Sequence, residues 1–217
     1  STIENNRITG SGSGGGIYFS GNLLTIDAST VSGNAINTST IGTGGGIQTS
    51  APLNIINSTV SGNAVNGGTF AASCNGGIGT SNQSVLIRNS TITGNRVAHG
   101  SAGGLDAVLV ADGSPSVTIY NTIVAGNFVG TGPSTTANDI NGTVDAAASF
   151  NNLIGTGDGG LSAVNDNQVG VIGPGLGTLQ DNGGPTLTCA VLPGSLAING
   201  GDKDWISGVD YDQRGPL

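Results

Sequence analysis

Small aliphatic residues alternate with polar residues in short stretches that return at nearly constant intervals along the chain. A strict alternation over a few positions is typical of a β-strand with one buried face. One set of alternating pairs is Leu24/Ile26, Leu53/Ile55, Val85/Ile87 and Val117/Ile119. The pattern therefore predicts a series of short strands that recur about once every thirty residues.

A hexapeptide repeats in step with these stretches. Ser-Thr-Val-Ser-Gly-Asn occupies residues 29–34 and 58–63, and related copies occupy 1–6, 90–95 and 122–127. The closing asparagines, 28, 29, 32 and 32 residues apart, are Asn6, Asn34, Asn63, Asn95 and Asn127. A glycine cluster precedes a further aliphatic residue in each of four repeats, namely Ile17, Ile47, Ile78 and Leu105. Several landmarks in one register indicate a repeat architecture.

Each repeat carries about three short strands separated by turns, and this predicts an all-β fold, a right-handed single-stranded parallel β-helix. We expect five to six coils of 28–32 residues, in which each strand pairs with the same strand of the next coil. The aliphatic residues at the centre of the hexapeptide should point inward, and their Thr and Ser neighbours outward.

Asparagines should form columns along the rod. The asparagine that closes the hexapeptide tolerates left-handed backbone angles, and stacked copies can hydrogen-bond as a ladder. A second column precedes the next hexapeptide and comprises Asn57, Asn89 and Asn121, with Ala28 in its place in the second coil.

The repeat weakens after Asn127 and has ended by Gly155, so we divide the chain into repeats over 1–155 and a closing segment over 156–217. Four prolines interrupt any regular strand series in the closing segment: Pro174, Pro185, Pro193 and Pro216. We expect this segment to add an irregular coil and then to cover the open end of the solenoid, because unpaired strand edges need cover.

The composition of the chain excludes two classes of partner, nucleic acid and the interior of a membrane. The 217 residues include 41 glycines and only 8% charged residues, with a net charge of −8. An acidic chain with five Lys and Arg residues cannot neutralise many phosphates, so nucleic acid is excluded as a partner. No apolar run approaches the ~20 residues that span a bilayer, which excludes membrane insertion by a helix.

The closing segment carries a family resemblance. The stretches concerned are 150–155 (Phe-Asn-Asn-Leu-Ile-Gly), 174–188 (with Asp-Asn-Gly-Gly-Pro-Thr), 192–202 and 212–215 (Asp-Gln-Arg-Gly). Together they resemble the choice-of-anchor Q group of bacterial secreted β-helix proteins, which are akin to polymorphic outer-membrane-protein repeats. The resemblance implies an exported, pectate-lyase-like solenoid that a separate signal holds at the cell surface. The chain departs from the family pattern at Cys189, where His is usual, and at Leu196, where Pro is usual.

Candidate catalytic residues do not form a recognisable constellation. A β-eliminating lyase needs a base and cationic groups, and an inverting hydrolase needs two carboxylates about 6.5–9.5 Å apart. The candidates are Arg88, Arg96, His99 and the pair Asp106 and Asp112. We predict no catalytic, cofactor-binding or metal site, and no cofactor.

Other candidate sites each have a simpler alternative. Asp202, Asp204, Asp210 and Asp212 could offer oxygen ligands to Ca²⁺, but a solvated acidic turn is the favoured interpretation. An outward Thr/Ser column could order water at an ice surface, but a solvated strand face is favoured; its members are Thr30, Ser32, Thr59, Ser61, Thr91 and Thr93.

Two alternatives stay open for the cysteines. Cys74 and Cys189 either form a disulfide, which requires the closing segment to fold back along the rod, or remain separate thiols.

We therefore expect a non-catalytic, extracellular structural protein of a bacterial cell surface or matrix. Ser1 opens inside a repeat, so we interpret the chain as a piece of a longer precursor. Two alternatives stay open for the edge of its first coil: it is a surface for self-association into head-to-tail filaments, or the chain is simply cut at a repeat boundary. The alternative is a carbohydrate-binding or adhesive module that binds surface glycans, although exposed aromatic residues are few. A polysaccharide lyase or hydrolase ranks third.

Overall fold

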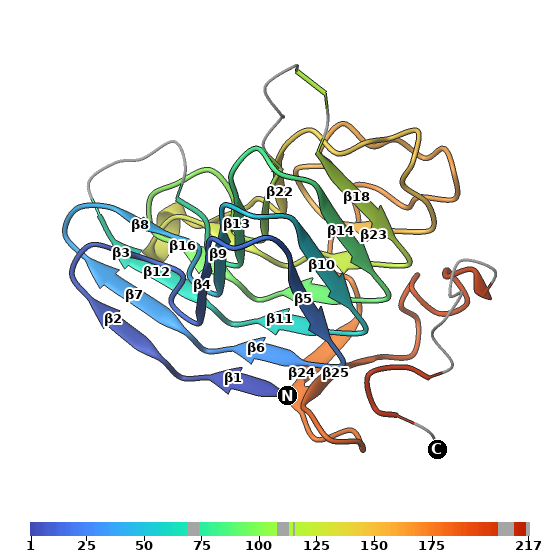
Figure 1. Ribbon diagram of the computed structural model, residues 1–217. Coiled ribbons are helices and arrows are strands. Elements are labelled where there is room, and N and C mark those ends of the chain that lie inside the picture. The colour runs from blue at the N-terminus through green and yellow to red at the C-terminus, as the bar shows by residue number, and fades with distance from the viewer. Residues whose placement is uncertain (69–73, 108–112, 115, 204–210, 216–217) are drawn as a thin grey trace.

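A computed structural model describes residues 1–68, 74–107, 113–114, 116–203 and 211–215. Over these residues the chain winds into a parallel β-solenoid of about five turns, as Figure 1 shows. The all-β parallel β-helix that the repeat predicts is confirmed. Gly132–Ser134 forms a 3₁₀ turn, and the described residues contain almost no other helical structure.

Two long sheets run side by side along the solenoid. The six strands of sheet A are β1 (Thr2–Glu4), β6 (Thr30–Ser32), β11 (Thr59–Ser61), β15 (Thr91–Thr93), β19 (Ile123–Val124) and β23 (Leu153–Ile154). Those of sheet B are β2 (Arg7–Thr9), β7 (Ala35–Thr38), β12 (Ala64–Gly67), β16 (Arg96–Val97), β20 (Phe128–Val129) and β21 (Thr136–Ala137), with only the last pair antiparallel. Each hexapeptide repeat thus supplies a strand of sheet A and the bend, and the residues that follow it form the strand of sheet B.

Two further long sheets complete each coil. The strands of sheet D are β4 (Ile17–Phe19), β9 (Ile47–Thr49), β13 (Ile78–Thr80), β17 (Leu105–Ala107) and β22 (Ile140–Gly142). Those of sheet E are β5 (Leu24–Asp27), β10 (Leu53–Ile56), β14 (Val85–Arg88) and β18 (Val117–Tyr120). A short sheet C joins β3 (Gly12–Ser13) to β8 (Gly42–Thr43) in the first two coils.

The estimate of about three strands per coil is therefore wrong, because a coil has four main strands. The hexapeptide and the aliphatic residue that follows it look like one strand and its turn in the sequence. In the structure they form two strands, such as β6 and β7, on either side of Gly33 and Asn34. Gly33 has a positive φ of 62°, which turns the chain sharply enough to start a new sheet.

The buried aliphatic residues form two clusters. Inward side chains of sheets A, D and E build the larger cluster, with Val60, Ile55 and Ile78 at its centre. A smaller cluster under sheet B contains Ile36, Val65 and Val97, together with Cys74. The bend between sheets A and B separates the two clusters.

The predicted asparagine ladder lies at this bend and is confirmed. Each Nδ2 donates to the Oδ1 of the asparagine in the next coil, at 2.9 Å for all four steps from Asn6 to Asn127. The same Oδ1 atoms also accept the backbone N–H of the preceding ladder residue, at 3.0–3.1 Å. The ladder therefore satisfies side-chain and backbone groups that are fully buried from Asn34 onward.

The distal end of the ladder is a carboxylate. Asp139 Oδ1 accepts from the backbone N–H of Asn127 at 2.7 Å and from its Nδ2 at 2.8 Å. Its Oδ2 accepts the backbone N–H of Thr156 at 2.7 Å. Burial raises the pKa of Asp139 although these hydrogen bonds oppose the shift.

The glycine clusters exist because the ladder packs directly against them. A Cβ on Gly46 would lie 2.9 Å from the Asn63 side chain, and a Cβ on Gly104 would lie 2.8 Å from the Asn127 side chain. Atoms do not approach so closely, so neither position accepts a larger residue. The recurring glycines and the recurring asparagines of the repeat therefore pack against each other.

One backbone prediction for the ladder is wrong. The closing asparagines do not adopt left-handed angles; the residue before each of them does, namely Asn5, Gly33, Gly62, Gly94 and Gly126. The second asparagine column is left-handed, with φ of 46° at Asn57 and 50° at Asn89, and Ala28 shares this geometry at 43°. A ladder asparagine must direct its amide inward along the rod, and the glycine before it makes the turn instead.

The closing segment has two parts with different positions. Residues 156–172 add a partial coil at the distal end, where Leu153 bridges to Gln168 and Leu161 is buried in the larger cluster. The rest, which we name the strap (residues 174–203 and 211–215), begins with the antiparallel pair β24 (Leu176–Gln180) and β25 (Thr188–Val191). In Figure 1 the strap, in orange and red, lies beside the coils.

The strap runs along the flank of the solenoid instead of covering its end, which corrects the expectation from the sequence. Thr30 Oγ1 donates to Leu187 O at 2.6 Å, and Asn121 exchanges two hydrogen bonds with the backbone of Asp202. Gln213 is the central contact because its side chain bonds to both the solenoid and the strap. Its Nε2 donates to Thr30 Oγ1 and Thr186 Oγ1 at 2.9 Å, and its Oε1 accepts from Thr59 Oγ1 at 2.7 Å.

The strap changes the environment of the outward Thr/Ser column. Thr30, Ser32, Thr59 and Ser61 are buried, although their side chains do leave the inner face of sheet A. The interpretation of this column as a solvated face is therefore wrong for the second and third coils. An ice-binding surface there is excluded for the same reason, since the strap occupies the place that water would need.

The two cysteines are separate thiols, so no disulfide links the strap to the coils. Cys74 is buried in the smaller cluster, and Cys189 lies in β25. Burial raises the pKa of Cys189, while a hydrogen bond from Ser61 opposes the shift.

We predict that Asn63→Ala lowers the free energy of unfolding by about 4 kcal/mol, because it leaves several buried donors and acceptors without partners. Chemical denaturation measures the change. The control is Asn66→Ala, which removes one exposed contact to Asn37 and should change stability by less than about 0.5 kcal/mol. Equal effects of the two substitutions would contradict the role assigned to the ladder.

We predict that Gln213→Ala loosens the strap while the coils stay folded. Loss of these buried hydrogen bonds should speed amide exchange in β24 and β25 at least tenfold, a change of about 1.4 kcal/mol or more. Hydrogen–deuterium exchange followed by mass spectrometry measures it. Gln180→Ala is the matched control, because the exposed side chain of Gln180 donates to Asn182 Oδ1 within the hairpin and does not contact the coils. Unchanged exchange in the Gln213 variant would show that other contacts hold the strap.

Candidate functional site

A polar groove of about 470 Å³ lies on the outward face of sheet D. One row of residues in register crosses this face, one from each coil: Tyr18, Gln48, Gly79, Asp106 and Asn141. Hydroxyl and amide side chains form the walls, namely Ser13, Thr43, Ser50, Thr80, Ser81 and Asn82. The volume lies within the range of small-ligand sites, about 300–1,000 Å³.

The repeat itself creates this row. In each coil the aliphatic residue after the glycine cluster points inward and is buried or packed against the core, as Ile47 and Ile78 are. Successive side chains of a strand point to opposite faces, so the residue that follows must point outward. Neighbouring coils therefore place these outward residues about 4.8 Å apart along the groove.

Gly79 leaves a gap in the middle of the row, and neighbouring side chains occupy it. The amide groups of Gln48 and Asn75 both lie within 3 Å of the place where a Cβ of Gly79 would be. Gln48 Nε2 is 3.5 Å from Ser81 Oγ, and Gln48 Oε1 is buried without a hydrogen-bond partner. An acceptor without a donor thus lies buried beside Gly79, on a residue that lines the groove.

Asp106 is the carboxyl group among the described residues that line the groove. It is only 4% exposed and lies on β17, whose position Thr80 fixes by donating its Oγ1 proton to Asp106 O at 2.9 Å. Asn141 Nδ2 donates to Asp106 Oδ1 at 2.8 Å, and the Asn75 side chain supplies a second hydrogen bond. Burial raises the pKa of Asp106, and these two neutral amides only partly oppose the shift.

Tyr18 ends the row with an aromatic ring that is 59% exposed. A second aromatic pair, Tyr120 and Phe150, stacks with ring centroids 6.1 Å apart, but both residues are half-buried at sheet E. Tyr18 is thus the exposed aromatic residue of the row on sheet D.

The candidate catalytic residues are not brought together. Arg96 donates to Gly130 O and to Thr135 Oγ1, both at 2.9 Å, so it holds a turn. Arg88 lies on sheet E in register with Tyr120, and His99 follows β16. Asp106 lies in the groove, but its proposed partner Asp112 falls outside the described residues.

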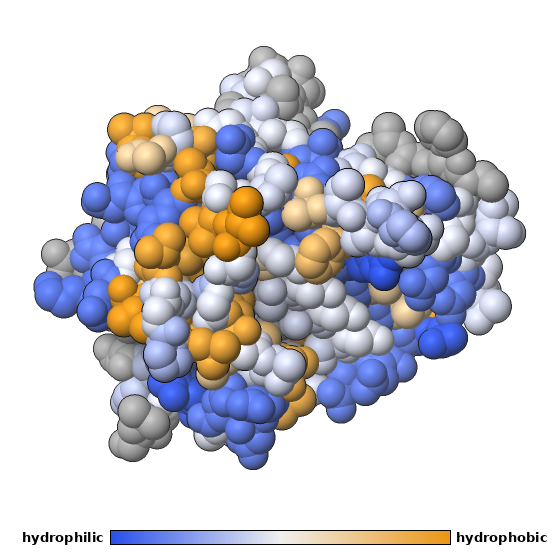
Figure 2. Space-filling model, turned by 180° about the vertical axis from the view of Figure 1, so that it is seen from behind, coloured by the Kyte–Doolittle hydropathy of each residue, from blue (hydrophilic) through white to orange (hydrophobic). Residues whose placement is uncertain are grey.

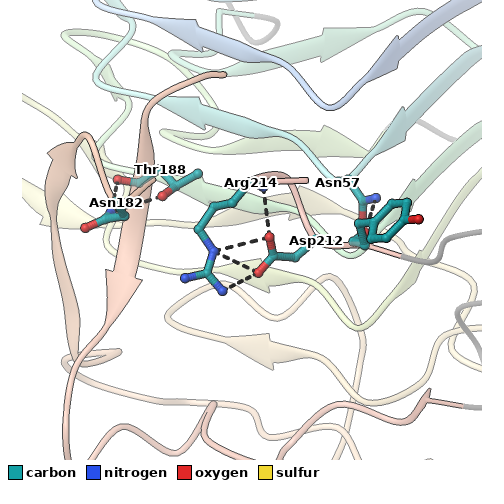
Figure 3. A network of polar contacts seen from close by, with 6 residues as sticks. Asn57, Asn182, Thr188, Asp212 and Arg214 are labelled. Atoms are coloured by element: carbon teal, nitrogen blue, oxygen red, sulfur yellow. Dashed lines mark hydrogen bonds and ion pairs between the residues drawn. The ribbon is translucent and has the colours of Figure 1, made fainter. Parts of the chain in front are cut away.

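The acidic cluster near the C-terminus is described only in part, since Asp204 and Asp210 lie outside the described residues. Asp212 forms an ion pair with Arg214, as Figure 3 shows, and this hydrogen-bonded cation lowers the pKa of Asp212. The described ranges of the chain contain no group of three or more His, Cys, Asp or Glu residues arranged to hold a metal ion.

The strap also exposes apolar side chains, including Val191, Leu192, Leu196 and Ile198. Figure 2 shows apolar patches on the molecule seen from behind, with polar residues between them. Such interrupted patches are common on protein surfaces and indicate no particular partner.

The sequence analysis missed the groove, although one signal could have found it. Aligning the position directly after the buried aliphatic residue of each glycine cluster gives Tyr18, Gln48, Gly79 and Asp106. Because these residues differ from coil to coil, a search for the same residue at a fixed spacing does not detect the row.

The fold defines the chain as a parallel β-solenoid. No protein-family model, no curated protein and no solved structure matches the chain. The resemblance to the choice-of-anchor Q group therefore stays a prediction. No helix among the residues that the structure describes is long and apolar enough to cross a membrane.

We predict that Asp106→Asn stabilises the protein more as the pH rises. A carboxyl group whose pKa is raised by folding stabilises the folded state below its unfolded pKa, and this contribution is lost as the pH rises through the folded pKa. Asparagine does not ionise, so the variant loses no stability in this way as the pH rises. Its side-chain oxygen can still accept the hydrogen bond from Asn141 Nδ2. The difference in thermal midpoint between variant and wild type should therefore increase from about pH 3.5 to pH 7. A difference independent of pH would contradict the burial effect.

Proposed function

We propose that this chain is a non-catalytic module of an extracellular surface that binds carbohydrate in the groove of sheet D. The observation that supports this proposal most is the row that leads from the exposed ring of Tyr18 past Gln48 to the buried carboxylate of Asp106. The groove supports the carbohydrate-binding alternative over a purely structural role.

The chemistry of the groove suits a sugar. A pyranose has an apolar face and a rim of hydroxyl groups that both donate and accept hydrogen bonds. Tyr18 offers an aromatic face for the former, and the hydroxyl and amide walls offer partners for the latter. Side chains that repeat at the spacing of the coils, about 4.8 Å, can contact successive units of a polysaccharide.

The same lining supports binding without catalysis. Asp106 is the one carboxylate among the described residues that line the groove, and Lys, Arg and His are absent from that lining. An inverting hydrolase needs a second carboxylate, and a lyase needs a base and cationic groups that neutralise a uronate.

The solenoid would act as the rigid support of the groove. The ladder and the strap fix the coils relative to one another, so the row on sheet D has a fixed spacing. The extracellular bacterial location rests on the composition and on the family resemblance. Self-association through the edge of the first coil stays a prediction from the sequence.

Affinity electrophoresis in gels that contain soluble β-glucan, xylan or glycol chitosan tests the proposal. We predict that at least one polysaccharide retards the protein and that Tyr18→Ala weakens the effect about fivefold to tenfold, the loss of one aromatic contact. Tyr211→Ala is the matched control, since Tyr211 is similarly exposed, at 54%, but lies on the strap. Migration unaffected by every polysaccharide, or equal effects of the two substitutions, would contradict the proposal.

A further inference from the structure

We infer that the groove prefers a polysaccharide that carries free amino groups, and that one ammonium binds beside Asp106 and Gln48. This inference rests on the proposed function and names the class of sugar. It follows from the acceptors in the groove, from the carboxyl group of Asp106, which no cation of the groove lining contacts, and from the position of the Gln48 amide over Gly79.

The charge of Asp106 has no cation to balance it among the residues that line the groove. Its described side-chain partners are the neutral amides of Asn141 and Asn75. A carboxylate has about four lone-pair positions, so these two donors leave acceptor capacity free. Placing a charge in a buried position is unfavourable unless a partner of opposite charge is supplied. A ligand cation would be that partner.

Gln48 places a second acceptor beside the first. Because Gly79 has no side chain, the Gln48 amide lies over it, one coil away from Asp106 in the register of sheet D. The Oε1 atom there is buried and has no hydrogen-bond partner. An ammonium has three donors and no acceptor, so it can bond to Gln48 Oε1 and the Asp106 carboxylate together.

A hydroxyl group fits this position less well. It can donate one hydrogen bond, and it does not compensate a negative charge. A uronate fits worst, because a second carboxylate would approach Asp106 in a chain whose net charge is already −8. The expected order of affinity is therefore amino sugar, then neutral sugar, then acidic sugar.

Tyr18 and Asp106 contact different sugar units of the ligand along the groove. They are three strands apart in the register of sheet D, which is about 14 Å at the spacing of a β-sheet. A ligand of several sugar units can therefore stack on Tyr18 while the amine of another unit lies at Asp106. Tyr18 contributes to the affinity for any sugar, and Asp106 distinguishes the amine.

The experiment compares oligosaccharides of equal length by isothermal titration calorimetry at about pH 6, where amines are protonated. The probes are glucosamine, N-acetylglucosamine and glucose β-1,4-hexamers, a hexamer of galacturonic acid, and hexalysine. We expect the glucosamine hexamer to bind at least tenfold more tightly than its acetylated form, the scale of one charge-assisted hydrogen bond. Hexalysine should bind more weakly, because it has no pyranose face for Tyr18.

Asp106→Asn should remove the preference for the amine, so that the glucosamine and N-acetylglucosamine hexamers bind with equal affinity. Tyr18→Ala should weaken the glucosamine and neutral hexamers by the same factor. Asp27→Asn is the matched control, because it removes one charge from an exposed position on sheet E and should leave every affinity unchanged. The thermal midpoint of each variant establishes that it is folded.

The outcomes separate the two proposals. Equal binding of the glucosamine and acetylated hexamers, or a preference that survives in Asp106→Asn, overturns the amine inference while carbohydrate binding stands. Hexalysine binding as tightly as the glucosamine hexamer also overturns it, because the site would then be a general cation site. If no hexamer binds and the polysaccharide gels also show no retardation, the proposed function fails as well.

Discussion

The contact between a buried asparagine ladder and the glycines packed against it is the constraint on which the rest of the solenoid depends. The ladder satisfies backbone N–H groups at the bend between sheets A and B, where a regular strand ladder is interrupted. Its amides need glycine opposite them, as at Gly46, and they need a sharp turn before them, as at Gly62. Because these requirements hold in every coil, they keep the coils in register. That register places the inward aliphatic residues above one another and, on the other face of the same strands, aligns the row of the groove.

The features that recur along the chain could be predicted from the sequence, and those that occur once could not. The ladder from Asn6 to Asn127 was predictable because five copies of one residue at one spacing have a simple structural meaning. The number of strands was underestimated because the turn at Gly33 is too short to separate two strands in a hydropathy pattern. The groove was missed because its members differ, and the position of the strap was missed because Gln213 contacts Thr30 and Thr59 over more than 150 residues of sequence. No local pattern reports a contact of that kind.

The two long faces of the solenoid serve different purposes. On sheet A, hydroxyl groups that could face water are covered by the strap, and Gln213 satisfies them as a solvent molecule otherwise would. On sheet D, polar residues line an open groove, and part of their hydrogen-bonding capacity is unused at Gln48. The contrast is informative because both faces carry polar side chains. Polar residues on a strand face indicate a site only where the chain itself does not complete their hydrogen bonds.

The strap also limits how this protein can change in length. Most solenoids can gain or lose a repeat, since each coil contacts only its neighbours. Here one segment is attached at Thr30 in the second coil and again at Asn121, three hexapeptide repeats further along. Insertion or deletion of a whole coil between these points would move one attachment by about 4.8 Å and break its hydrogen bonds. The length of the strap therefore fixes the number of coils between its two attachment points. Duplication of a repeat in this chain would require a longer strap.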